Sequence, residues 1–489
     1  MSSFEIPKEV SRITEILEKN GFLAYLVGGC VRHLLMKQAP NDWDITTNAK
    51  PEEIAALFPK TFYENQFGTV TVVNEEVTDP TLRHVEITPF RKEGKYSDKR
   101  HPDFVIFGQS LEEDLQRRDF TINALAYNHS KGQLIDLYDG QKDIQAKIIR
   151  AVGSPDERFQ EDPLRILRGI RLASQLGFMI NTETASSMAN NSSLISGVSR
   201  ERVRDEFVKI ILSDQPMIGL VLCQKLAILK LIISELEEGL LMKQNGDHKY
   251  DVFEHIMRTL QHAADKKYGL EVRLGALFHD IGKPRTRKWD DSKKDWTFYG
   301  HDLVGSKMTE EILERLKFSK KLKQVVVTLV RNHMFFSDTE KISLSAVRRL
   351  VSRVGTENIW QLMEVRNCDR IGMGRPKESP YRLRKYHSMI EESLRSPTSV
   401  SMLAVRGEDV IRETNLAPGP QIGYILHILL EEVLEKPELN KEEYLINRIK
   451  ELAKLTISDL KKAGETSKLK KEDIETKELN KIRSKYHVK

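Results

Sequence analysis

Residues 27–45 constrain the fold of this chain more than any other segment. An apolar strand pattern ends at Gly28 and Gly29, a helix-forming run follows, and Asp42 and Asp44 open the next strand. Paired glycines let the backbone approach phosphate oxygens, and the amides at the start of the following helix point at them. Carboxylates at positions i and i+2 of a strand share a face, so this pair can hold metal ions that bind a triphosphate. The segment predicts an α/β domain with a nucleotide site.

Each half of this pattern is weak by itself, because most Gly-Gly pairs are ordinary turns and most Asp-x-Asp pairs lie in solvated loops. Their order within one short segment is much more specific. Arg32 falls one turn into the predicted helix. A polar run further along the chain adds Arg117, Arg118, Asp119 and Asn123.

With these motifs, residues 5–452 resemble the class II tRNA nucleotidyltransferases, the family of CCA-adding enzymes and poly(A) polymerases in the DNA polymerase β superfamily. The resemblance implies a polymerase-β-like α/β head with a small mixed sheet, followed by an all-α neck, an HD body and a tail. It implies that Asp42 and Asp44 bind two Mg²⁺ ions. The nucleotide-binding residues that it implies in the head are Gly28, Gly29, Arg32, Arg117, Arg118, Asp119 and Asn123. The family usually has an aspartate where this chain has His33, so no role carries over to that position.

Two divalent ions in such a site would lower the pKa of an RNA 3′-hydroxyl and neutralise charge on the α-phosphate and the departing pyrophosphate. A third acidic group commonly completes the site. Glu86 lies on an alternating pattern that predicts a strand, and it is the candidate for this third catalytic group. The alternative for Glu86 is a surface charge at a strand edge.

The spacing of Asp162 and Arg165 predicts that both lie on one face of a helix. Arginine offers only donors and aspartate only acceptors. Cytosine and adenine each present an exocyclic amine beside a bare ring nitrogen, so the pair can select CTP and ATP over UTP and GTP. The resemblance identifies the same segment as the family's amino-acid template for the incoming base, with Arg168 and Arg171 in the flanking match. An exposed helical salt bridge is the alternative.

A second set of potential metal ligands lies downstream. Its members are His255, His279, Asp280, His301, His333 and Asp369. Mixed imidazole and carboxylate ligands suit a transition metal or a Mg²⁺ or Mn²⁺ site that activates water. Their order resembles the HD phosphohydrolase superfamily. This resemblance implies that His255, His279, Asp280 and Asp369 bind a divalent metal such as Mg²⁺, Mn²⁺ or Ni²⁺. It implies that His301 and His333 extend the site.

The activity of this HD domain has two interpretations. In some relatives it hydrolyses 2′,3′-cyclic or terminal phosphates on RNA, and in others it is mainly a structural body. We expect a live phosphohydrolase because all four ligands are present, with the inert scaffold as the alternative.

Three further segments carry part of the resemblance. The polar loop 91–102 matches the flexible loop that the family requires for adding A, which argues against an enzyme that adds only C. Residues 136–140 resemble the hinge between head and neck, and residues 201–206 resemble a helix that stabilises the neck. A plain turn and a plain charged helix are the alternatives for the last two.

Length and composition agree with several domains, because 489 residues exceed what one core usually supports. The 77 Lys and Arg residues against 72 Asp and Glu residues leave a net charge of only +5, so RNA affinity must come from clustered charge. Cys30, Cys223 and Cys368 are far apart among apolar neighbours, which predicts reduced, buried thiols. We find no secretory pattern and no apolar run near the ~20 residues of a membrane span, and expect a cytoplasmic protein with residues 218–236 as a buried helix.

Periodicity and composition divide the chain into a head (1–150), a helical neck (151–240), an HD body (241–395), a helical tail (396–452) and a charged extension (453–489) that is a helix or disordered. Strands are expected at 23–27, 43–46, 69–73 and 84–88, and helices beginning at Pro7 and Pro51. In the tail, residues 405–410 and 418–423 resemble tRNA-processing members. Gly and Pro before a helix would expose N–H groups to a tRNA phosphate, although an ordinary helix cap is the alternative.

Together these features predict an enzyme that builds or repairs the 3′-terminal CCA of tRNA from CTP and ATP without a nucleic-acid template. An A-adding enzyme that works with a separate CC-adding partner would carry the same motifs. A poly(A) polymerase would not need the tail segment 418–423. From a different class, the chain could be an RNA-end phosphohydrolase or RNA-binding scaffold with a vestigial head, but the intact Asp42, Asp44, Asp119 and Arg165 argue against it. The sequence does not indicate an oligomeric state.

Overall fold

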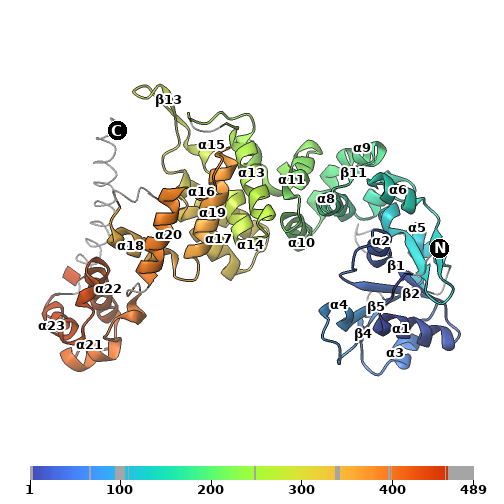
Figure 1. Cartoon of the computed structure of the whole chain (residues 1–489), viewed down its shortest axis with the longest axis horizontal. Coiled ribbons are helices and arrows are strands. Elements are labelled where there is room, and N and C mark those ends of the chain that lie inside the picture. The colour runs from blue at the N-terminus through green and yellow to red at the C-terminus, as the bar shows by residue number, and fades with distance from the viewer. Residues whose placement is uncertain are drawn as a thin grey trace. The chain divides into compact units, whose positions relative to one another are not determined.

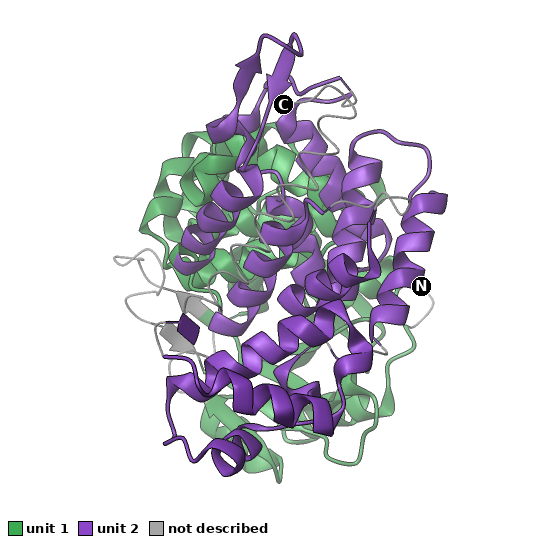
Figure 2. Ribbon diagram, turned by 90° about the vertical axis from the view of Figure 1, so that its left-hand side faces the viewer, with its two compact units in different colours: residues 1–237, 315–318 green, residues 238–314, 319–489 purple. Residues whose placement is uncertain are grey.

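The computed structural model describes residues 4–64, 68–93, 105–107, 110–246, 249–335, 342–394, 397, 399–456 and 459–460. The chain divides into two compact units (Figures 1 and 2). Unit 1 comprises residues 1–237 and 315–318, and unit 2 comprises residues 238–314 and 319–489.

Unit 1 begins with a mixed sheet of seven strands in the order β3-β4-β5-β2-β1-β8-β9. The strands are β1 (Ala24–Val27), β2 (Trp43–Thr47), β3 (Thr61–Glu64), β4 (Thr69–Val73), β5 (His84–Pro89), β8 (Leu125–Asn128) and β9 (Gln133–Asp136). Only β2 and β5 pair in parallel; the other neighbours in this sheet are antiparallel. The α/β head and the four strands expected from the sequence are confirmed.

Helices cover this sheet and supply its apolar core. They are α1 (Lys8–Lys19), α2 (Gly29–Leu35), α3 (Pro51–Leu57), α4 (Pro80–Arg83), α5 (Leu111–Gln116) and α6 (Gly140–Ala146), with the 3-10 turn η1 (Thr121–Asn123). The spacing of Val10, Ile13 and Leu17 puts these side chains on one face of α1, where they are buried against Ile45 and Ile87 of the sheet. Both helices predicted to begin near Pro7 and Pro51 are present.

From residue 147 to 237, unit 1 is mainly helical and contains the short parallel pair β10 (Ile148–Ile149) and β11 (Met179–Ile180). Its helices are α7 (Pro155–Glu161), α8 (Leu164–Leu176), α9 (Thr182–Asn190), α10 (Arg200–Ile211), α11 (Pro216–Lys225) and α12 (Leu229–Ile233), with η2 (Ser192–Gly197) and η3 (Ser234–Gly239).

The prediction of one buried helix over residues 218–236 is wrong. The segment breaks between α11 and α12, where Ala227 has a left-handed φ of 55°. In the described part of the chain no single helix is long and apolar enough to cross a membrane. The bent pair of Pro216–Lys225 and Leu229–Gly239, which turns by 99°, passes the same test by length and composition.

Unit 2 is a helical assembly with one small hairpin. Its helices are α13 (Val252–Asp265), α14 (Leu270–Phe278), α15 (Lys283–Thr286), α16 (His301–Arg315, the last residue belonging to unit 1), α17 (Lys320–Asn332), α18 (Leu344–Val354), α19 (Ile359–Gly372), α20 (Tyr381–Leu394), α21 (Gly407–Thr414), α22 (Pro420–Glu435) and α23 (Glu442–Leu452), with η4 (Val400–Met402) and η5 (Pro437–Leu439). The hairpin pairs β12 (Lys288–Asp290) with β13 (Asp295–Thr297). As predicted, a helix begins at Pro420 directly after Gly419.

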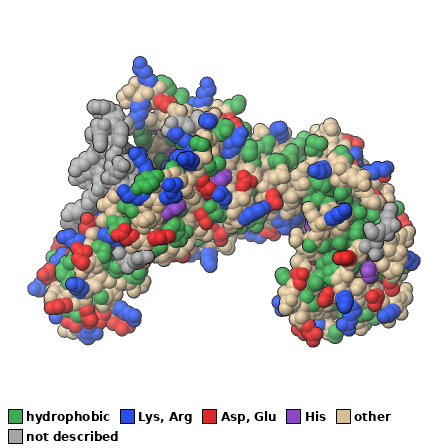
Figure 3. Space-filling model, in the orientation of Figure 1, with side chains coloured by type: hydrophobic (Ala, Val, Ile, Leu, Met, Phe, Trp, Pro, Cys, Tyr) green, Lys and Arg blue, Asp and Glu red, His purple; other side chains and the backbone are tan. Residues whose placement is uncertain are grey.

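Two sequence predictions fall largely outside the described residues. The loop 91–102 is described only at its start, where β6 (Arg91–Glu93) pairs with β7 (Val105–Phe107). The charged extension from 453 is described only at 453–456 and 459–460. On the face shown in Figure 3, Lys and Arg side chains are interspersed with Asp and Glu side chains, which agrees with the small net charge.

Candidate functional site

The head brings its predicted metal ligands together beside the glycine turn. Asp42 directly precedes β2, and Asp44 lies within it opposite Glu86 of the parallel strand β5. Trp43 between the two aspartates is buried, so the carboxylates share the other face of the strand. The three acidic groups interact electrostatically at Asp44. Burial, reinforced by Asp42 and Glu86, raises the pKa of Asp44 to about 7.

Gly28 and Gly29 form the turn at the edge of this acidic group. Gly28 has a φ of 80°, which favours glycine. A Cβ at this position would lie 3.0 Å from Arg118 Nη1 and 3.7 Å from Asp44 Oδ2. At Gly29 a Cβ would lie 3.8 Å from Asp42 Oδ1. The glycine turn therefore lies directly beside the carboxylates of Asp42 and Asp44.

The arginines at the end of α5 are held by a residue that sequence reasoning missed. Asp114, fully buried, binds Arg117 Nη2 at 2.6 Å and Arg118 Nη2 at 3.2 Å. The signal was present in the sequence, because an aspartate three and four residues before two arginines lies on their face of a helix. Asp114 fixes the direction of both guanidinium groups.

Asp119 and Asn123 lie in one buried network with two other predicted residues. Asp119 Oδ2 binds Arg168 Nη2 at 2.7 Å, and Asp119 Oδ1 accepts from Asn123 Nδ2 at 3.3 Å. Arg32 in turn donates to the side-chain oxygen of Asn123. Burial acts to raise the pKa of Asp119, but Arg168 and Arg165 hold it below its ordinary value. His33 lies beside Arg32, with Nε2 3.2 Å from Arg32 Nη2.

The predicted template pair is adjacent to this network, but Asp162 is not helical. Helix α7 ends at Glu161, Asp162 is extended with φ −139° and ψ 99°, and α8 begins at Leu164. The helical-face prediction was wrong because Pro163 disfavours helical backbone at the residue before it. Asp162 lies at a junction between two helices, and Arg165 lies in the first turn of α8.

Both members of the pair have protein partners that the sequence prediction did not include. Arg202 Nη2 binds Asp162 Oδ2 at 2.8 Å, and Arg165 Nη1 binds Glu161 Oε2 at 2.8 Å. Arg171, two turns along α8 from Arg165, binds Glu206 at 3.2 Å. Arg202 and Glu206 belong to α10, in the segment that resembles a neck-stabilising helix, but their partners are long-range in sequence and have no local signal.

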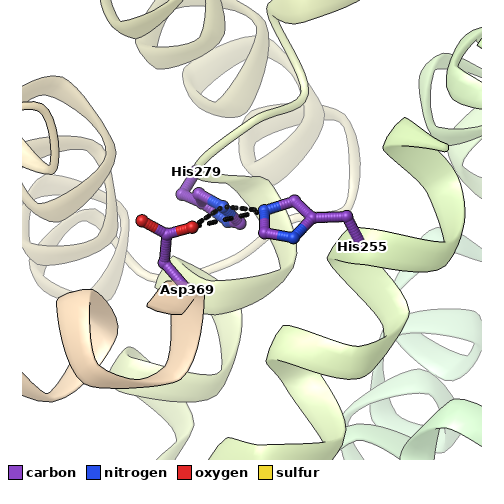
Figure 4. A group of neighbouring side chains, drawn as sticks. All are labelled: His255, His279 and Asp369. Carbon is purple, nitrogen blue, oxygen red and sulfur yellow. Dashed lines mark hydrogen bonds and ion pairs between the residues drawn. The ribbon is translucent and has the colours of Figure 1, made fainter. Parts of the chain in front are cut away.

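All six predicted ligands of the HD unit converge in its interior. They form two groups with ligand atoms within 4.8 Å of one another, the first being His255, His279 and Asp369 and the second being Asp280, His301 and His333. Figure 4 shows the first group, whose side chains point toward one another from α13, α19 and the end of α14. Among the described residues only these two groups are so compact, and the head carboxylates are more widely spaced.

Asp280 connects the two groups. Its Oδ2 lies 3.0 Å from His255 Nε2 and 3.3 Å from His279 Nε2, while its Oδ1 lies 3.3 Å from His301 Nε2 and 3.7 Å from His333 Nε2. One carboxylate therefore presents an oxygen to each group. This is the arrangement of a bridging ligand between two cations.

The imidazole hydrogen bonds fit metal binding. The Nδ1 atoms of His279, His301 and His333 lie 2.8, 2.6 and 2.7 Å from backbone carbonyl oxygens. A carbonyl can only accept, so each Nδ1 carries the proton, and Nε2 is the atom left to coordinate. His301 Nε2 and His333 Nε2 are 3.2 Å apart, a separation at which a shared cation relieves the repulsion of two lone pairs.

Two cations next to these ligands were not predicted. Lys283 Nζ binds Asp280 Oδ2 at 2.6 Å, and Arg366 Nη1 binds Asp369 Oδ2. Burial acts to raise the pKa of Asp280, but His279 and Lys283 hold it well below its ordinary value. Burial acts to lower the pKa of His279, but Asp280 and Asp369 raise it to about 10. Lys283 follows the ligand Asp280 by three residues, and Arg366 precedes the ligand Asp369 by three. This spacing is the sequence signal that could have identified both cations.

Known domain families match the segments that contain the two groups of residues. Residues 24–150 match the Poly A polymerase head domain, residues 177–240 the probable RNA and SrmB-binding site of polymerase A, and residues 252–371 the HD domain. The fold and the two sites define a nucleotidyltransferase with an HD domain.

A relative that matches over nearly its full length identifies the family of this chain. The chain is 31% identical to the CCA-adding enzyme of Ligilactobacillus salivarius over 456 residues, which cover 91% of this chain and 98% of that protein. The chain belongs to the family of CCA-adding enzymes. It is 47% identical over 209 residues to the CCA-adding enzyme of Lactobacillus delbrueckii subsp. bulgaricus, but this match spans only 42% of the chain and about half (51%) of that relative.

Solved structures show the same fold. The CCA-adding enzyme of Bacillus stearothermophilus in complex with CTP matches with a TM-score of 0.68 and 26% identity, over 91% of this chain and 98% of that one. The Thermotoga maritima CCA-adding enzyme complexed with tRNA matches with a TM-score of 0.53 and 19% identity, over 92% of this chain and all of that one. The predicted family and fold class are confirmed.

Proposed function

We propose that this chain completes the 3′ end of tRNA by adding C, C and A from CTP and ATP without a nucleic-acid template. The observation that carries the proposal is the convergence of Asp42, Asp44 and Glu86 beside the Gly28-Gly29 turn. Full-length similarity to a CCA-adding enzyme supports it, as does likeness to such an enzyme bound to CTP.

In the proposed reaction the terminal 3′-oxygen of the RNA bonds to the α-phosphorus of the nucleotide. The bond from that phosphorus to the β-phosphate oxygen breaks, pyrophosphate leaves, and the hydroxyl proton is released. Two Mg²⁺ ions, when bound, lower the pKa of the hydroxyl and neutralise the phosphates. Asp42, Asp44 and Glu86 would hold these ions, because carboxylate oxygens are the protein ligands that Mg²⁺ prefers.

The basic residues of the same unit would bind the nucleotide. Arg118 lies next to Gly28, where it can reach a triphosphate, and Asp114 holds it in that direction. Asp119 and Asn123 would contact the ribose through the network that also fixes Arg32 and Arg168.

Asp162 and Arg165 would select the base by accepting from the exocyclic amine and donating to the ring nitrogen of C or A. Uracil and guanine put a carbonyl opposite the aspartate and a ring N–H opposite the arginine, so they fail both contacts. In the structure these two groups bind Arg202 and Glu161, so an incoming base must replace at least one protein partner.

The test offers purified protein three RNAs: a tRNA transcript lacking CCA, a transcript lacking only the final A, and a generic RNA. CTP and ATP are supplied separately and together. We expect three nucleotides on the first transcript and then a stop. Addition only to the transcript ending in CC would instead indicate an A-adding enzyme, and long A tails on the generic RNA a poly(A) polymerase.

We propose for the HD unit that it hydrolyses phosphate esters at RNA ends or on nucleotides. The bridging position of Asp280 between two buried ligand groups carries this second function. Water adds to phosphorus, one P–O bond to the ribose breaks, and the ribose oxygen takes up a proton. Divalent ions bound by the two groups supply Lewis acidity and activate the water.

Hydrolysis of adenosine 2′,3′-cyclic phosphate is measured with Mg²⁺, Mn²⁺ or Ni²⁺ for the unsubstituted protein and for His279→Ala with Asp280→Ala. The double variant should lose the activity while CCA addition continues. Equal hydrolysis by both proteins, or none by the unsubstituted protein with any of the metals, would make the HD unit a scaffold.

A further inference from the structure

A cavity of about 390 Å³ extends from the candidate metal ligands of unit 2 to the β12–β13 hairpin. This volume is in the range of sites for small molecules and cofactors. Its lining includes Asp280, His301, His333 and Asp369, which we call the charged end, and Trp296 and Tyr299 of the hairpin segment, which we call the aromatic end. Charged and aromatic side chains therefore line the same cavity.

The charged end suits a phosphate group. Besides the metal ligands it contains Lys283 and Arg366, each bound to one oxygen of a ligand carboxylate. Lys283 is 6% exposed, and its ammonium also donates to Gln244 Oε1 at 2.6 Å. Lys283 and Arg366 are held beside the candidate metal ligands. They can bind the anionic group of a ligand that enters the cavity with this group first.

The aromatic end has rings with cations next to them. The Arg287 guanidinium lies 3.6 Å from the centroid of the Trp296 ring, and the Lys293 ammonium lies 5.0 Å from the centroid of the Tyr299 ring. Tyr299 is nevertheless 53% exposed. Figures 1 and 2 both show the hairpin extending away from the helices of unit 2. Aromatic rings combined with nearby cations are a common means of binding nucleobases.

The aromatic and charged ends are directly connected. Tyr299 lies two residues before the ligand His301, and the carbonyl of Phe298 accepts from His301 Nδ1 at 2.6 Å. Two residues span at most about 7 Å, so the Cα atoms of Tyr299 and His301 are close together and both side chains line the same cavity.

Stabilisation of the hairpin explains the positions of its two tryptophans but not that of Tyr299. Trp289 and Trp296 form a cross-strand pair with ring centroids 5.2 Å apart, which stabilises two short strands. Tyr299 lies beyond β13, and its hydroxyl accepts from Lys293 Nζ. Its ring is half exposed and lines the cavity, where it can contact a ligand.

We propose that the hairpin segment binds the nucleobase of the ester hydrolysed by the HD unit, stacked on Tyr299 and Trp296, with its phosphate toward Lys283 and Arg366. This inference rests on the proposed phosphohydrolase function. The ligand is a nucleoside phosphate, either free or at the end of an RNA. The hairpin makes the site select nucleotide esters over other phosphate esters.

The test measures kcat and KM for Tyr299→Ala and Trp296→Ala on two probes, adenosine 2′,3′-cyclic phosphate and glycerol 1,2-cyclic phosphate, which has no base. We expect KM for the adenosine ester to rise about tenfold, with kcat within about twofold and the base-free ester unaffected. Tyr299→Phe and Trp296→Phe, which retain a ring, should restore most of the affinity. Tyr381→Ala is the matched control, because Tyr381 is 69% exposed in the same unit and lies outside the cavity lining.

Equal losses on both probes, or no change on the adenosine ester, would overturn the hairpin's role while leaving the hydrolase function standing. Inactivity of the unsubstituted protein on both probes would overturn the hydrolase function and the inference with it. An RNA oligonucleotide ending in the same cyclic phosphate is compared with the free nucleotide. A base effect on either source supports the proposal, and the source with the larger effect identifies the substrate.

Discussion

The pKa of Asp44 in the head and the pKa values of Asp280 and Asp369 in the HD unit are shifted in opposite directions. Burial and two acidic neighbours raise the pKa of Asp44 to about 7. In the HD unit, burial acts the same way on Asp280 and Asp369, but surrounding imidazoles and cations hold both pKa values well below the ordinary value. Around Asp44 the acidic neighbours outweigh Arg118, so an added cation would favour its charged form, whereas Asp280 and Asp369 already face positive partners.

This difference suits the two proposed chemistries. A site in which several acidic groups lie close together binds Mg²⁺ most favourably when the nucleotide also contributes phosphate ligands, so its ions can arrive and leave with each substrate. Six buried ligands in two connected groups can hold ions between reactions. Four predictions test how far this contrast holds.

The largest expected effect is on nucleotide addition. Asp42→Ala removes one of the three candidate carboxylate ligands of the head site and should lower CTP and ATP incorporation on the order of 10³-fold or more. Hydrolysis by the HD unit should be unchanged, because its ligands lie in the other compact unit. Incorporation is measured on tRNA lacking CCA. The control is Asp79→Ala, which alters a helix cap in the same domain; full incorporation by Asp42→Ala would remove this residue from the metal site.

The second prediction concerns the number of ions in the HD unit. His301→Ala removes a ligand of the second group only, so the purified protein should hold one tightly bound metal equivalent fewer than the unsubstituted protein. Hydrolysis should fall about 10²-fold, in line with loss of one partner of a metal pair. Metal content is measured by elemental analysis after dialysis. Unchanged stoichiometry would mean that Asp280 does not bridge two ions.

The third prediction follows from the raised pKa of Asp44. In the unfolded chain this carboxyl loses its proton near pH 4, but in the metal-free fold it keeps the proton until about pH 7. The folded state therefore binds more protons over this window, and the stability of the metal-free head falls as the pH rises from about 4 to about 7. This cost is about 4 kcal/mol at pH 8 for pKa values near 4 and 7. Asp44→Asn removes the charge but still buries a polar amide, so we expect a net stabilisation of half that, about 2 kcal/mol.

In calorimetry with a chelator, this stabilisation corresponds to a rise in Tm of about 4–8 °C at pH 8 for a unit of this size. The gain should vanish at pH 3.5, where both states are protonated. Added Mg²⁺ should raise the Tm of the unsubstituted protein and not that of the variant. A variant that is less stable than the unsubstituted protein at pH 8 would contradict the charge imbalance inferred for the head.

The smallest effect is expected at Arg202. Arg202→Ala frees Asp162 from its 2.8 Å ion pair and should change the ratio of kcat/KM for CTP over UTP by about tenfold or less. Arg204→Ala is the matched control in the same helix, because Arg204 binds Asp205 and does not contact Asp162. An unchanged ratio would show that Arg202 only supports the fold.

The parts of the molecule that the sequence predicted correctly depend on short-range patterns. Alternation in 69–73 and 84–88 marks strands, and the i, i+2 aspartates mark a strand face, because these periods follow directly from backbone geometry. The HD ligands were found because their order matches a family. The helical face of Asp162 failed where Pro163 interrupts the period, and the helix at 218–236 failed where Ala227 turns the chain.

The partners of the site residues could not be predicted in the same way. Arg202 and Asp162 are 40 residues apart, and Lys283 binds Gln244 across 39 residues. Such pairs depend on how helices pack, which the sequence of either segment alone does not specify. Asp114 is the exception, because its spacing from Arg117 and Arg118 is local.

The junction between α7 and α8 has a consequence for fidelity if Asp162 and Arg165 select the base. In this structure both groups have protein partners, so each arriving nucleotide competes with a side chain of the protein before it can be accepted. Cytosine or adenine can replace the internal partners, because each makes hydrogen bonds to both Asp162 and Arg165. Uracil or guanine cannot make these bonds and leaves the internal ion pairs intact. Discrimination between bases then depends on the difference between the bonds to the base and the internal ion pairs of Asp162 and Arg165. Weakening these internal pairs would reduce the discrimination against every wrong base at once.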